Sequence, residues 1–420
     1  MSQSRRRVVV TGVGAVTSLA LGAHETFAGL LEGKSGIDTI RAFDPSGHST
    51  RIAGEVLGKT FRAEDHFDRQ ALRRLDPFSQ IGLVCAREAM ADAGLAQGDY
   101  DPDRSGAILG SGIGGIHTTL WGQSMMDADG PRRVTPFYVP NLMPNALPGN
   151  IAIEFGLAGP CFLTASACAS SGHAIGLAMR EIADGRADLV LTGGTEASLM
   201  PVTLAGFSRL RALSSRNDDP AAASRPFDRD RDGFVLADGG AALVLEAEDH
   251  ARARGARIYC ELAGFGQSDD AGHITAPDET GGRPARAITL ALADAGIRPE
   301  EVDYVNAHGT STQLNDRMES QALKLALGEG PARAAAISST KSMLGHLLGG
   351  ASAIEAVVTA LTLHQGVAHG TRNLEHPDVE NGCDLDYIPE KRREQEFRAA
   401  ISNSFGFGGH NVCLAFRRWS

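Results

Sequence analysis

The sequence has no CxxC pair and no cysteine spacing typical of a disulfide framework. Its six cysteines are Cys85, Cys161, Cys168, Cys260, Cys383 and Cys413. Because no secretory segment is recognisable, we interpret them as reduced thiols and expect a cytoplasmic protein. The 13 histidines do not cluster with cysteines at zinc-binding spacing. These absences argue against secreted disulfide scaffolds and the common zinc modules.

Long apolar runs and positive charge are also scarce. No stretch approaches the roughly 20 apolar residues that cross a bilayer, so we expect no membrane association. Lysine and arginine number 40 against 51 aspartates and glutamates, which gives a net charge of -11. Because an acidic chain repels phosphate, we do not expect nucleic acid as a partner. The composition is globular, but 420 residues are too many for one ordinary core.

Two parts of the chain repeat the same order of elements. The matched pairs are the strands 7–15 and 257–267, the helices that begin at Pro77 and Pro284, the strands 105–112 and 302–309, and the helices 167–185 and 345–366. Alternating strands and helices indicate α/β layers. The repeat therefore predicts two related halves, residues 1–255 and 256–420.

The last matched pair of helices has small residues in the first turn of each. Helices with so little charge must be buried on most sides, where a neighbouring backbone comes close. Cys168 lies where a strand-like run turns into the first of them. The positive end of the helix dipole can lower a cysteine pKa from about 8.5 to well under 7.5. We therefore predict that Cys168 is a nucleophile, and that Cys85 and Cys413, inside a helix and a strand, are structural.

A cysteine nucleophile needs a partner, and histidine is the usual one. His308 lies in VNAHGTST, at a strand end followed by small hydroxyl residues. His346 lies at the head of the second small-residue helix, in the place that mirrors Cys168. We expect the two helix starts to face each other across a pseudo-twofold axis. Polar neighbours of the two histidines are Asp316, Glu319 and Lys341.

Two familiar motifs lack the context that their function needs. Residues 110–115 fit GxGxxG after a strand, but they do not open the first βαβ unit, and no ribose-binding acid lies at the right distance. Residues 228–233 look like the start of a calcium loop, yet the twelfth position is Gly239 instead of a bidentate Glu. We interpret both segments as turns or surface loops.

Five segments together carry a family resemblance. They are SACASSG around Cys168, SRPFDRDRDGFVLADGG at 224–240, NAHGTST at 306–312, KSMLGHLLG at 341–349 and NSFGFGGHN at 403–411. The chain resembles the elongating β-ketoacyl-acyl carrier protein synthases of dissociated fatty acid synthesis from residue 6 to residue 417. The resemblance implies a thiolase-like fold with five αβαβα layers built from two duplicated halves.

The resemblance also implies a mechanism. Cys168 would accept an acyl group from a carrier-protein thioester. His308 and His346 would stabilise the enolate that forms when malonyl carrier protein loses carbon dioxide, and the enolate would attack the acyl group. The backbone N–H groups of Cys168 and Phe407 would form the oxyanion hole. Lys341 would hold the histidines in order, with Asp316 and Glu319 as its charge partners.

Further residues match family positions with binding roles. Phe407, between glycines, would gate the acyl pocket, and Thr310 and Thr312 would bind the pantetheine arm. Other expected pocket residues are Ile113 and Phe137, at the far end and dimer side, together with Phe405 and Gly408. Asn306, Glu355, Ser402 and Asn403 match a structural monovalent-cation site of some relatives. No other cofactor is expected.

The expected partners are acyl carrier protein, in acyl and malonyl forms, and a second subunit. The family is usually homodimeric. Carrier proteins are strongly acidic, so an acidic enzyme needs a local basic patch to dock them. Arg73, Arg74, Arg132, Arg133 and Arg211 match such docking positions, with 132 and 133 reaching the entrance of the partner subunit.

Four alternatives share this fold. The catalytic ketosynthase of a type II polyketide synthase, paired with a chain-length factor, fits the motifs equally well. A non-enzymatic chain-length factor would lack the cysteine, so Cys168 argues against it. Coenzyme A-primed starter synthases have asparagine where this chain has His346, and thiolases need a second catalytic cysteine, for which Cys383 is a poor candidate. The Cys-His-His set thus favours the elongating class.

Overall fold

Ten strands form one continuous sheet in this computed structural model, which describes residues 5–389 and 391–419. The first half contributes β1 (Val8–Val16), β4 (Ser105–Gly110), β5 (Cys161–Thr164), β6 (Leu189–Glu196) and β7 (Gly239–Ala247). The second half contributes β8 (Cys260–Asp269), β9 (Tyr304–Asn306), β10 (Ala336–Ser338), β13 (Ala399–Gly406) and β14 (His410–Arg418).

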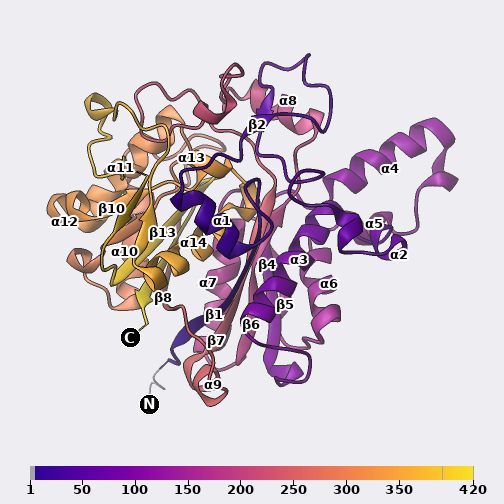
Figure 1. The fold of residues 1–420 in the computed structure, drawn as a ribbon, viewed down its shortest axis with the longest axis horizontal. Helices are drawn as coiled ribbons and strands as arrows, with labels where there is room; N and C mark the ends of the chain where they lie inside the picture. Colours follow the sequence, from indigo (N-terminus) through magenta and orange to yellow (C-terminus); the bar gives the residue numbers. More distant parts are fainter. Residues whose placement is uncertain (1–4, 390, 420) are drawn as a thin grey trace.

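The strand order repeats between the halves. From the outer edge to the centre, the first half runs β5-β4-β6-β7-β1 and the second runs β10-β9-β13-β14-β8. If the five strands of each half are numbered along the chain, both halves have the strand order 3-2-4-5-1 from the outer edge to the centre. β1 and β8 join them in antiparallel pairing at Val9–Glu261 and Val10–Cys260. The two halves therefore share one topology and lie side by side (Figure 1). The boundary at residue 255 stays a prediction.

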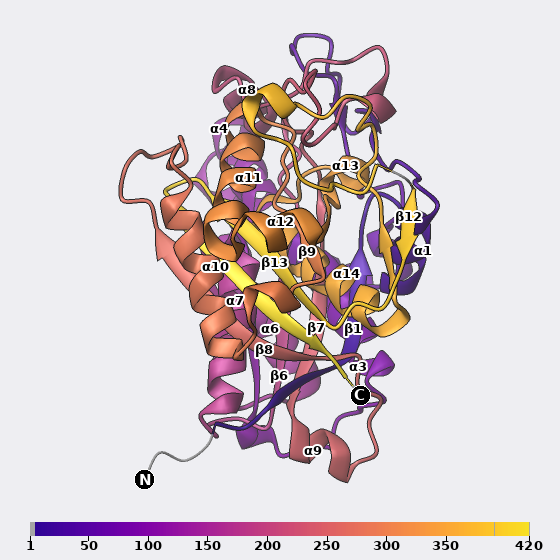
Figure 2. The same cartoon turned by 90° about the vertical axis from the view of Figure 1, so that its left-hand side faces the viewer.

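Helices form three layers around the strands. α7 (Ser170–Ala183) and α14 (Ala351–Gln365) contact strands of both halves, so they form the central layer. α3 (Pro77–Asp92) and α6 (Ala146–Phe155) cover the outer face of the first half. α10 (Gly282–Ala295) and α11 (Gln313–Leu327) lie on the outer side of the second half, which faces the viewer in Figure 2. This is the five-layered αβαβα arrangement that the sequence predicts.

The central helices are as buried as their composition requires. Every residue of α14 from Ala351 to Leu363 is buried. In α7, a methyl group on Gly176 would lie 2.3 Å from the Phe265 ring of β8. The small residues thus let a strand of the opposite half pack directly on the helix.

Helix starts differ from the predicted ones in three places, one of which is the start of α7 at Ser170 instead of residue 167. α10 begins at Gly282, which puts Pro284 at its third residue, still within the turn where a backbone N–H is free. The helix expected from residue 345 begins at Ala351, because Gly345 and Leu348 have positive φ angles that interrupt the helical conformation. Counted from the start of α14, the equivalent of Cys168 is Gly349, but counted from the 3-10 turn Leu348–Gly350 that runs into α14 it is His346. The mirror relation between Cys168 and His346 stays a prediction.

An arm projects from the body of the first half. It consists of α4 (Ile116–Asp129) and α5 (Tyr138–Leu142), and α4 extends to the right in Figure 1. Gly122 is the one residue of α4 that is buried. Trp121, Met126 and Val139 expose large apolar side chains on this arm. In the described part of the chain, no helix is long and apolar enough to cross a membrane.

The remaining elements connect these layers. The helices are α1 (Ala23–Leu31), α2 (Arg69–Leu72), α8 (Pro201–Arg209), α9 (Glu248–Ala253), α12 (Glu329–Ala334) and α13 (Lys341–Leu344). Short two-stranded pairs are formed by β2 (Asp38–Thr39) with β3 (Ile52–Ala53), and by β11 (Val367–His369) with β12 (Arg392–Glu394).

Candidate active site

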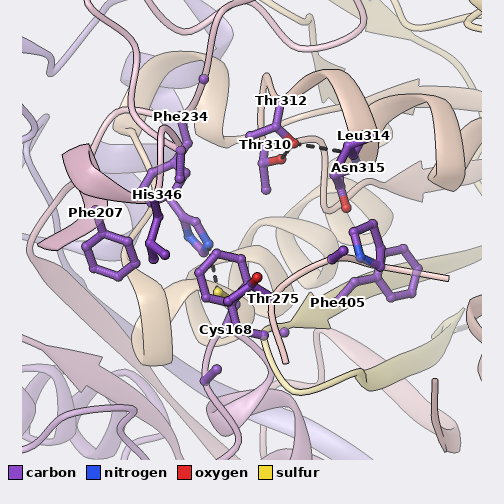
Figure 3. Close-up of a pocket in the computed structure, with 18 of the residues that line it drawn as sticks. Cys168, Phe207, Phe234, Thr275, Thr310, Thr312, Leu314, Asn315, His346 and Phe405 are labelled. Carbon is purple, nitrogen blue, oxygen red and sulfur yellow. Dashed lines mark hydrogen bonds between the residues drawn. The ribbon is translucent and has the colours of Figure 1, made fainter. Parts of the chain in front are cut away.

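A cavity of about 430 Å³ opens where segments from both halves meet. Cys168 and His346 line it, and His308 packs against His346 with ring centroids 5.5 Å apart. Cys168 precedes α7, His308 follows β9, and His346 lies between α13 and α14. The fold therefore brings together the three residues that the sequence singles out, and Figure 3 shows Cys168 and His346 in contact.

The thiol and one imidazole are in direct contact. His346 Nε2 lies 3.0 Å from Cys168 Sγ. Ala167 holds the turn before the cysteine in a left-handed conformation with φ 49°. The Ser170 hydroxyl braces this turn, since it donates to the Ala167 carbonyl at 2.7 Å, and Ser352 donates to the Cys168 carbonyl at 3.1 Å. The position of Sγ is thus fixed by hydrogen bonds from both central helices.

The partners of the other ring nitrogens define the tautomers. The Leu348 N–H donates to His346 Nδ1 at 3.3 Å, and the Lys341 ammonium lies 3.2 Å from His308 Nδ1. Each Nδ1 therefore accepts a hydrogen bond, so the proton of each neutral ring sits on Nε2. Burial, with the nearby Lys341 charge, holds the pKa of both histidines well below the usual value. Both rings are neutral and donate from Nε2.

The same tautomers bear on metal binding. One ligand atom from each of Cys168, His308 and His346 lies within 4.8 Å of the others, which is close enough to surround an ion. A metal needs a lone pair on the ligating nitrogen. Because both Nε2 atoms carry protons here, they present hydrogen-bond donors and no lone pairs to the cavity.

Lys341 is paired with Glu355, a carboxylate that the sequence predicts only as a cation ligand. Its ammonium forms a buried ion pair with Glu355 of α14 and donates to the His308 carbonyl at 2.7 Å. Glu319 instead accepts from the backbone N–H groups of His308 and Gly309, both at 2.8 Å. Asp316 lies 3.6 Å from Arg231 and accepts from a backbone N–H. The prediction that Asp316 and Glu319 are the charge partners of Lys341 is therefore wrong.

The environment of the Cys168 thiol acts against the lowering of its pKa that a helix start can cause. Burial raises the pKa of Cys168 to about 11, although the charge of Lys341 and the backbone N–H groups of Phe407 and Cys168 act in the opposite direction. Cys168 has 8% of its surface exposed, so loss of hydration outweighs the position before a helix. The two N–H groups that face the sulfur are those expected to form the oxyanion hole.

The turn between β13 and β14 lies against the nucleophile. A methyl group on Gly406 would lie 2.8 Å from the Ser166 carbonyl oxygen, so the close approach requires glycine. The Phe407 ring packs 6.4 Å from Phe207, and Phe405 lies 5.7 Å from the His308 ring, both between centroids. The turn thus places two aromatic rings in the cavity wall.

Most of the expected pocket residues line the cavity, and two do not. Ile113, Thr310, Thr312 and Phe405 line it, and the two threonine hydroxyls lie 2.9 Å apart. Gly408 is not among the lining residues. Phe137 lines a second cavity of about 1020 Å³, where Arg74 lies over its ring. Phe137 belongs to the arm, so within one chain it cannot close the acyl pocket.

The five predicted docking arginines are exposed but dispersed. Arg211 lines the cavity that holds Cys168, whereas Arg73 lines the second one. Arg132 and Arg133 lie in the turn directly after α4, at the far end of the arm. A single chain therefore does not bring the arginines into one patch.

Sequence reasoning missed two contributors to the site and gave a third, Glu355, only the role of a cation ligand. The pairing of Glu355 with Lys341 has a signal, because Glu355 is the one charged residue among the first 13 of α14. Phe234 contacts His346 edge to face at 5.2 Å, and Glu196 binds the backbone behind the cavity. Neither of these two has a local sequence signal, since both are contacts between distant segments.

Comparison with known proteins adds independent evidence. The model of the family "Beta-ketoacyl synthase, N-terminal domain" matches residues 5–251, and that of "Beta-ketoacyl synthase, C-terminal domain" matches residues 259–375. The chain is 46% identical over 415 residues to "3-oxoacyl-[acyl-carrier-protein] synthase 2" of Synechocystis sp., with 99% of each chain covered.

Two solved structures are also similar. A ketosynthase bound to a hexaketide, in complex with its type II PKS acyl-carrier protein, has 35% identity and a TM-score of 0.89. The ishigamide ketosynthase/chain length factor has 34% identity and a TM-score of 0.91. Each comparison covers 99% of this chain and 100% of the other.

Proposed function

The chain belongs to the β-ketoacyl synthase family, and we propose that it condenses malonyl and acyl groups through an acyl-enzyme on Cys168. It is an elongating 3-oxoacyl-[acyl-carrier-protein] synthase, an acyltransferase of fatty acid synthesis. The contact of 3.0 Å between His346 Nε2 and Cys168 Sγ carries the residue assignment. It joins a nucleophile from the first half to a hydrogen-bond donor from the second.

The first step is acyl transfer. Cys168 Sγ attacks the thioester carbonyl of the acyl carrier, a new C–S bond forms, and the carrier leaves as its thiol with the proton that Cys168 gives up. The backbone N–H groups of Cys168 and Phe407 face the sulfur and can bind the developing oxyanion. Each donor of this kind is typically worth roughly 3 kcal/mol.

The second step is decarboxylation and condensation. The bond from the malonyl carbon to its carboxylate breaks, carbon dioxide leaves, and the electron pair remains as an enolate. The Nε2–H groups of His308 and His346 donate to the enolate oxygen, as their tautomers allow. The enolate carbon then attacks the acyl carbonyl, the C–S bond breaks, and the sulfur of Cys168 regains a proton from solvent. The product is a 3-oxoacyl chain two carbons longer.

Lys341 and Glu355 act through His308. The Lys341 ammonium holds His308 Nδ1 as an acceptor, and Glu355 compensates the buried positive charge. Glu319 fixes the backbone of the same loop. These groups are positioning residues because they contact His308 and its backbone, and they act on the reaction only through it.

The cavity walls define substrate contacts. Thr310 and Thr312 would bind the pantetheine arm, and Phe407 would gate the acyl pocket beside Phe405 and Ile113. Glycine at position 408 has a φ of 91°, which gives the gate the backbone freedom that it needs. Phe137 would reach the acyl pocket of a neighbouring subunit instead of its own.

The residues for a structural monovalent cation also fit the site. Asn306 and Ser402 are neighbours in register on β9 and β13. Glu355 Oε2 and Asn403 Oδ1 are buried and accept no hydrogen bond of normal length. A cation held by Asn306, Glu355, Ser402 and Asn403 would satisfy these oxygens. It would supply positive charge beside Lys341 and take no part in bond making, and we propose no other cofactor.

We infer that the protein works as a dimer in the cytoplasm and docks acyl carrier protein. The arm exposes apolar side chains, and β5 is an edge strand with Phe162 exposed, as expected of surfaces that a second subunit covers. A dimer would carry Arg132 and Arg133 to the neighbouring entrance. The six free cysteines suit a reducing compartment.

Pairing with a chain-length factor is the second candidate. The similarity to the ishigamide ketosynthase/chain length factor favours it, but identity to that structure is lower than to the fatty acid enzyme. The test is a condensation assay with the purified chain alone, acyl carrier and labelled malonyl carrier. We expect carbon dioxide release and a single two-carbon extension. Activity only after addition of a homologous subunit would support the polyketide alternative instead.

A further inference from the structure

The glycine-rich segment 110–115 is not a nucleotide loop, but it surrounds a buried carboxylate. Glu196, at the end of β6, is fully buried. Its side chain accepts five hydrogen bonds, and among the described residues no ion pair with Lys, Arg or His holds it. The donors are Ser111 Oγ at 2.9 Å and the N–H groups of Gly112 at 2.7 Å, Ile113 at 3.2 Å, Gly114 at 3.3 Å and Gly349 at 3.1 Å.

These donors come from two neighbouring segments, and both segments contribute residues to the cavity wall. Residues 111–114 carry Ile113, which lines the acyl pocket. Gly349 lies three residues after His346. One oxygen, Oε2, is shared by Gly112 and Gly349, and a methyl group on Gly349 would lie 2.2 Å from the Gly112 nitrogen. The carboxylate therefore clamps the pocket wall directly to the segment that follows His346.

The clamped peptide also sets the tautomer of the histidine. The Leu348 N–H is the donor to His346 Nδ1, and Leu348 holds an unfavourable left-handed conformation with φ 46°. The next N–H, from Gly349, is bound by Glu196. A shift of this peptide would weaken the bond to Nδ1 and with it the preference for a proton on Nε2.

We propose that Glu196 is a positioning residue that sets the acyl-pocket wall at Ile113 and the donor tautomer of His346 together. The proposal rests on the proposed function of Cys168 and His346. It predicts that one substitution, remote from substrate, changes both acyl-chain selectivity and decarboxylation. A purely structural carboxylate would lower the stability and leave the selectivity unchanged.

The test compares Glu196→Gln with Ser111→Ala and a matched control. Glutamine keeps the shape of the side chain but places an amide N–H₂ against N–H donors. Ser111→Ala removes one donor and keeps the carboxylate. It should therefore change decarboxylation and acyl loading in the same direction by a smaller factor, and it tests the proposal even if Glu196→Gln does not fold. The control is Glu246→Gln. Glu246 is another fully buried glutamate, which lies on β7, does not line the cavity, and is paired with His250 of α9 and with Arg254 just after α9.

The measurements are malonyl-carrier decarboxylation and the loading of Cys168 with a short and a long saturated acyl group, alongside thermal unfolding. A lost hydrogen bond to a charged group corresponds to about a tenfold effect. We expect Glu196→Gln to lower decarboxylation about tenfold and to change the long-to-short loading ratio by a similar factor, with Ser111→Ala following in the same direction. Glu246→Gln should shift unfolding only.

Two outcomes overturn the proposal. One is an unchanged loading ratio and decarboxylation rate in both cavity variants. The other is an equal change in the Glu246→Gln control. Absence of any acyl group on Cys168 in the wild type would instead refute the proposed function, so the two failures are distinguishable.

Discussion

His346 Nε2 lies 3.0 Å from Cys168 Sγ, although the two residues are 178 positions apart in the chain. The contact exists because the two halves present their central helices to each other. Since the Leu348 N–H donates to His346 Nδ1, the proton of the imidazole is on Nε2, and Nε2 faces the sulfur as a hydrogen-bond donor. His346 can therefore stabilise negative charge at the thiolate or at a substrate oxygen, but it is not set up to remove the thiol proton.

Alkylation of Cys168 should follow the raised pKa of its thiol. The thiolate is the reactive form, and burial raises the pKa to about 11. The thiolate fraction, and so the alkylation rate with an uncharged reagent, should rise about tenfold per pH unit from about pH 6 to about pH 9. Peptide mapping of a Cys161→Ser background, which removes the exposed cysteine, measures the rate at Cys168. A plateau below about pH 7.5 would show an acidic thiol instead.

The two histidines should serve decarboxylation more than acyl loading. Replacing either His308 or His346 with Ala removes one donor to the enolate, so carbon dioxide release from malonyl carrier should fall at least about 100-fold. Loading of Cys168 should survive in part. Cys168→Ala is the complementary variant. It should lose condensation but retain decarboxylation, because that step depends on the histidines. Normal carbon dioxide release in both histidine variants would contradict the mechanism.

Variants of Lys341 and Glu355 should show that the pair has separate effects on folding stability and on decarboxylation. Lys341→Met leaves Glu355 as an unpaired buried carboxylate, which typically costs about 3–5 kcal/mol of unfolding free energy. The double change Lys341→Met with Glu355→Leu should recover much of that stability. It should not recover decarboxylation, because His308 Nδ1 still lacks its donor. Recovery of both in the double variant would mean that Lys341 has only a structural role.

Reversal of charge on the arm should weaken carrier docking. Arg132→Glu with Arg133→Glu should raise the KM for carrier-bound substrate, and added salt should do the same to the wild type, because the attraction is electrostatic. Turnover of a small acyl-pantetheine mimic should stay nearly constant. Arg298→Glu, an exposed change before β9, is the matched control. Equal losses on carrier and mimic would place the docking surface elsewhere.

Much of the fold follows from pattern alone. The repeated elements predict two halves with the same strand order, and the small-residue content of α7 and α14 predicts a buried central layer. Both depend on local composition and periodicity, which a sequence displays directly. The meeting of Cys168, His308 and His346 follows from the same repeat together with the family resemblance.

Other features depend on contacts that no local pattern encodes. The direction of the Cys168 pKa shift depends on how much water the folded chain excludes, and a helix start alone does not reveal it. Glu355 reaches Lys341 from the next helix, whereas Asp316, closer to His308 in sequence, pairs with Arg231. Phe137 lies on an arm that leaves the body, so its distance from the pocket depends on tertiary structure.

The central claim is that the growing chain is held on Cys168. Wild-type protein is mixed with a panel of acyl carrier proteins without malonyl carrier, digested, and the cysteine peptides are analysed by mass spectrometry. Cys168→Ala is the control. We expect one acyl group on the Cys168 peptide of the wild type, none in the control, and loss of the group when malonyl carrier is added. An acyl group on another cysteine, or condensation with no acyl-enzyme at all, would contradict the account.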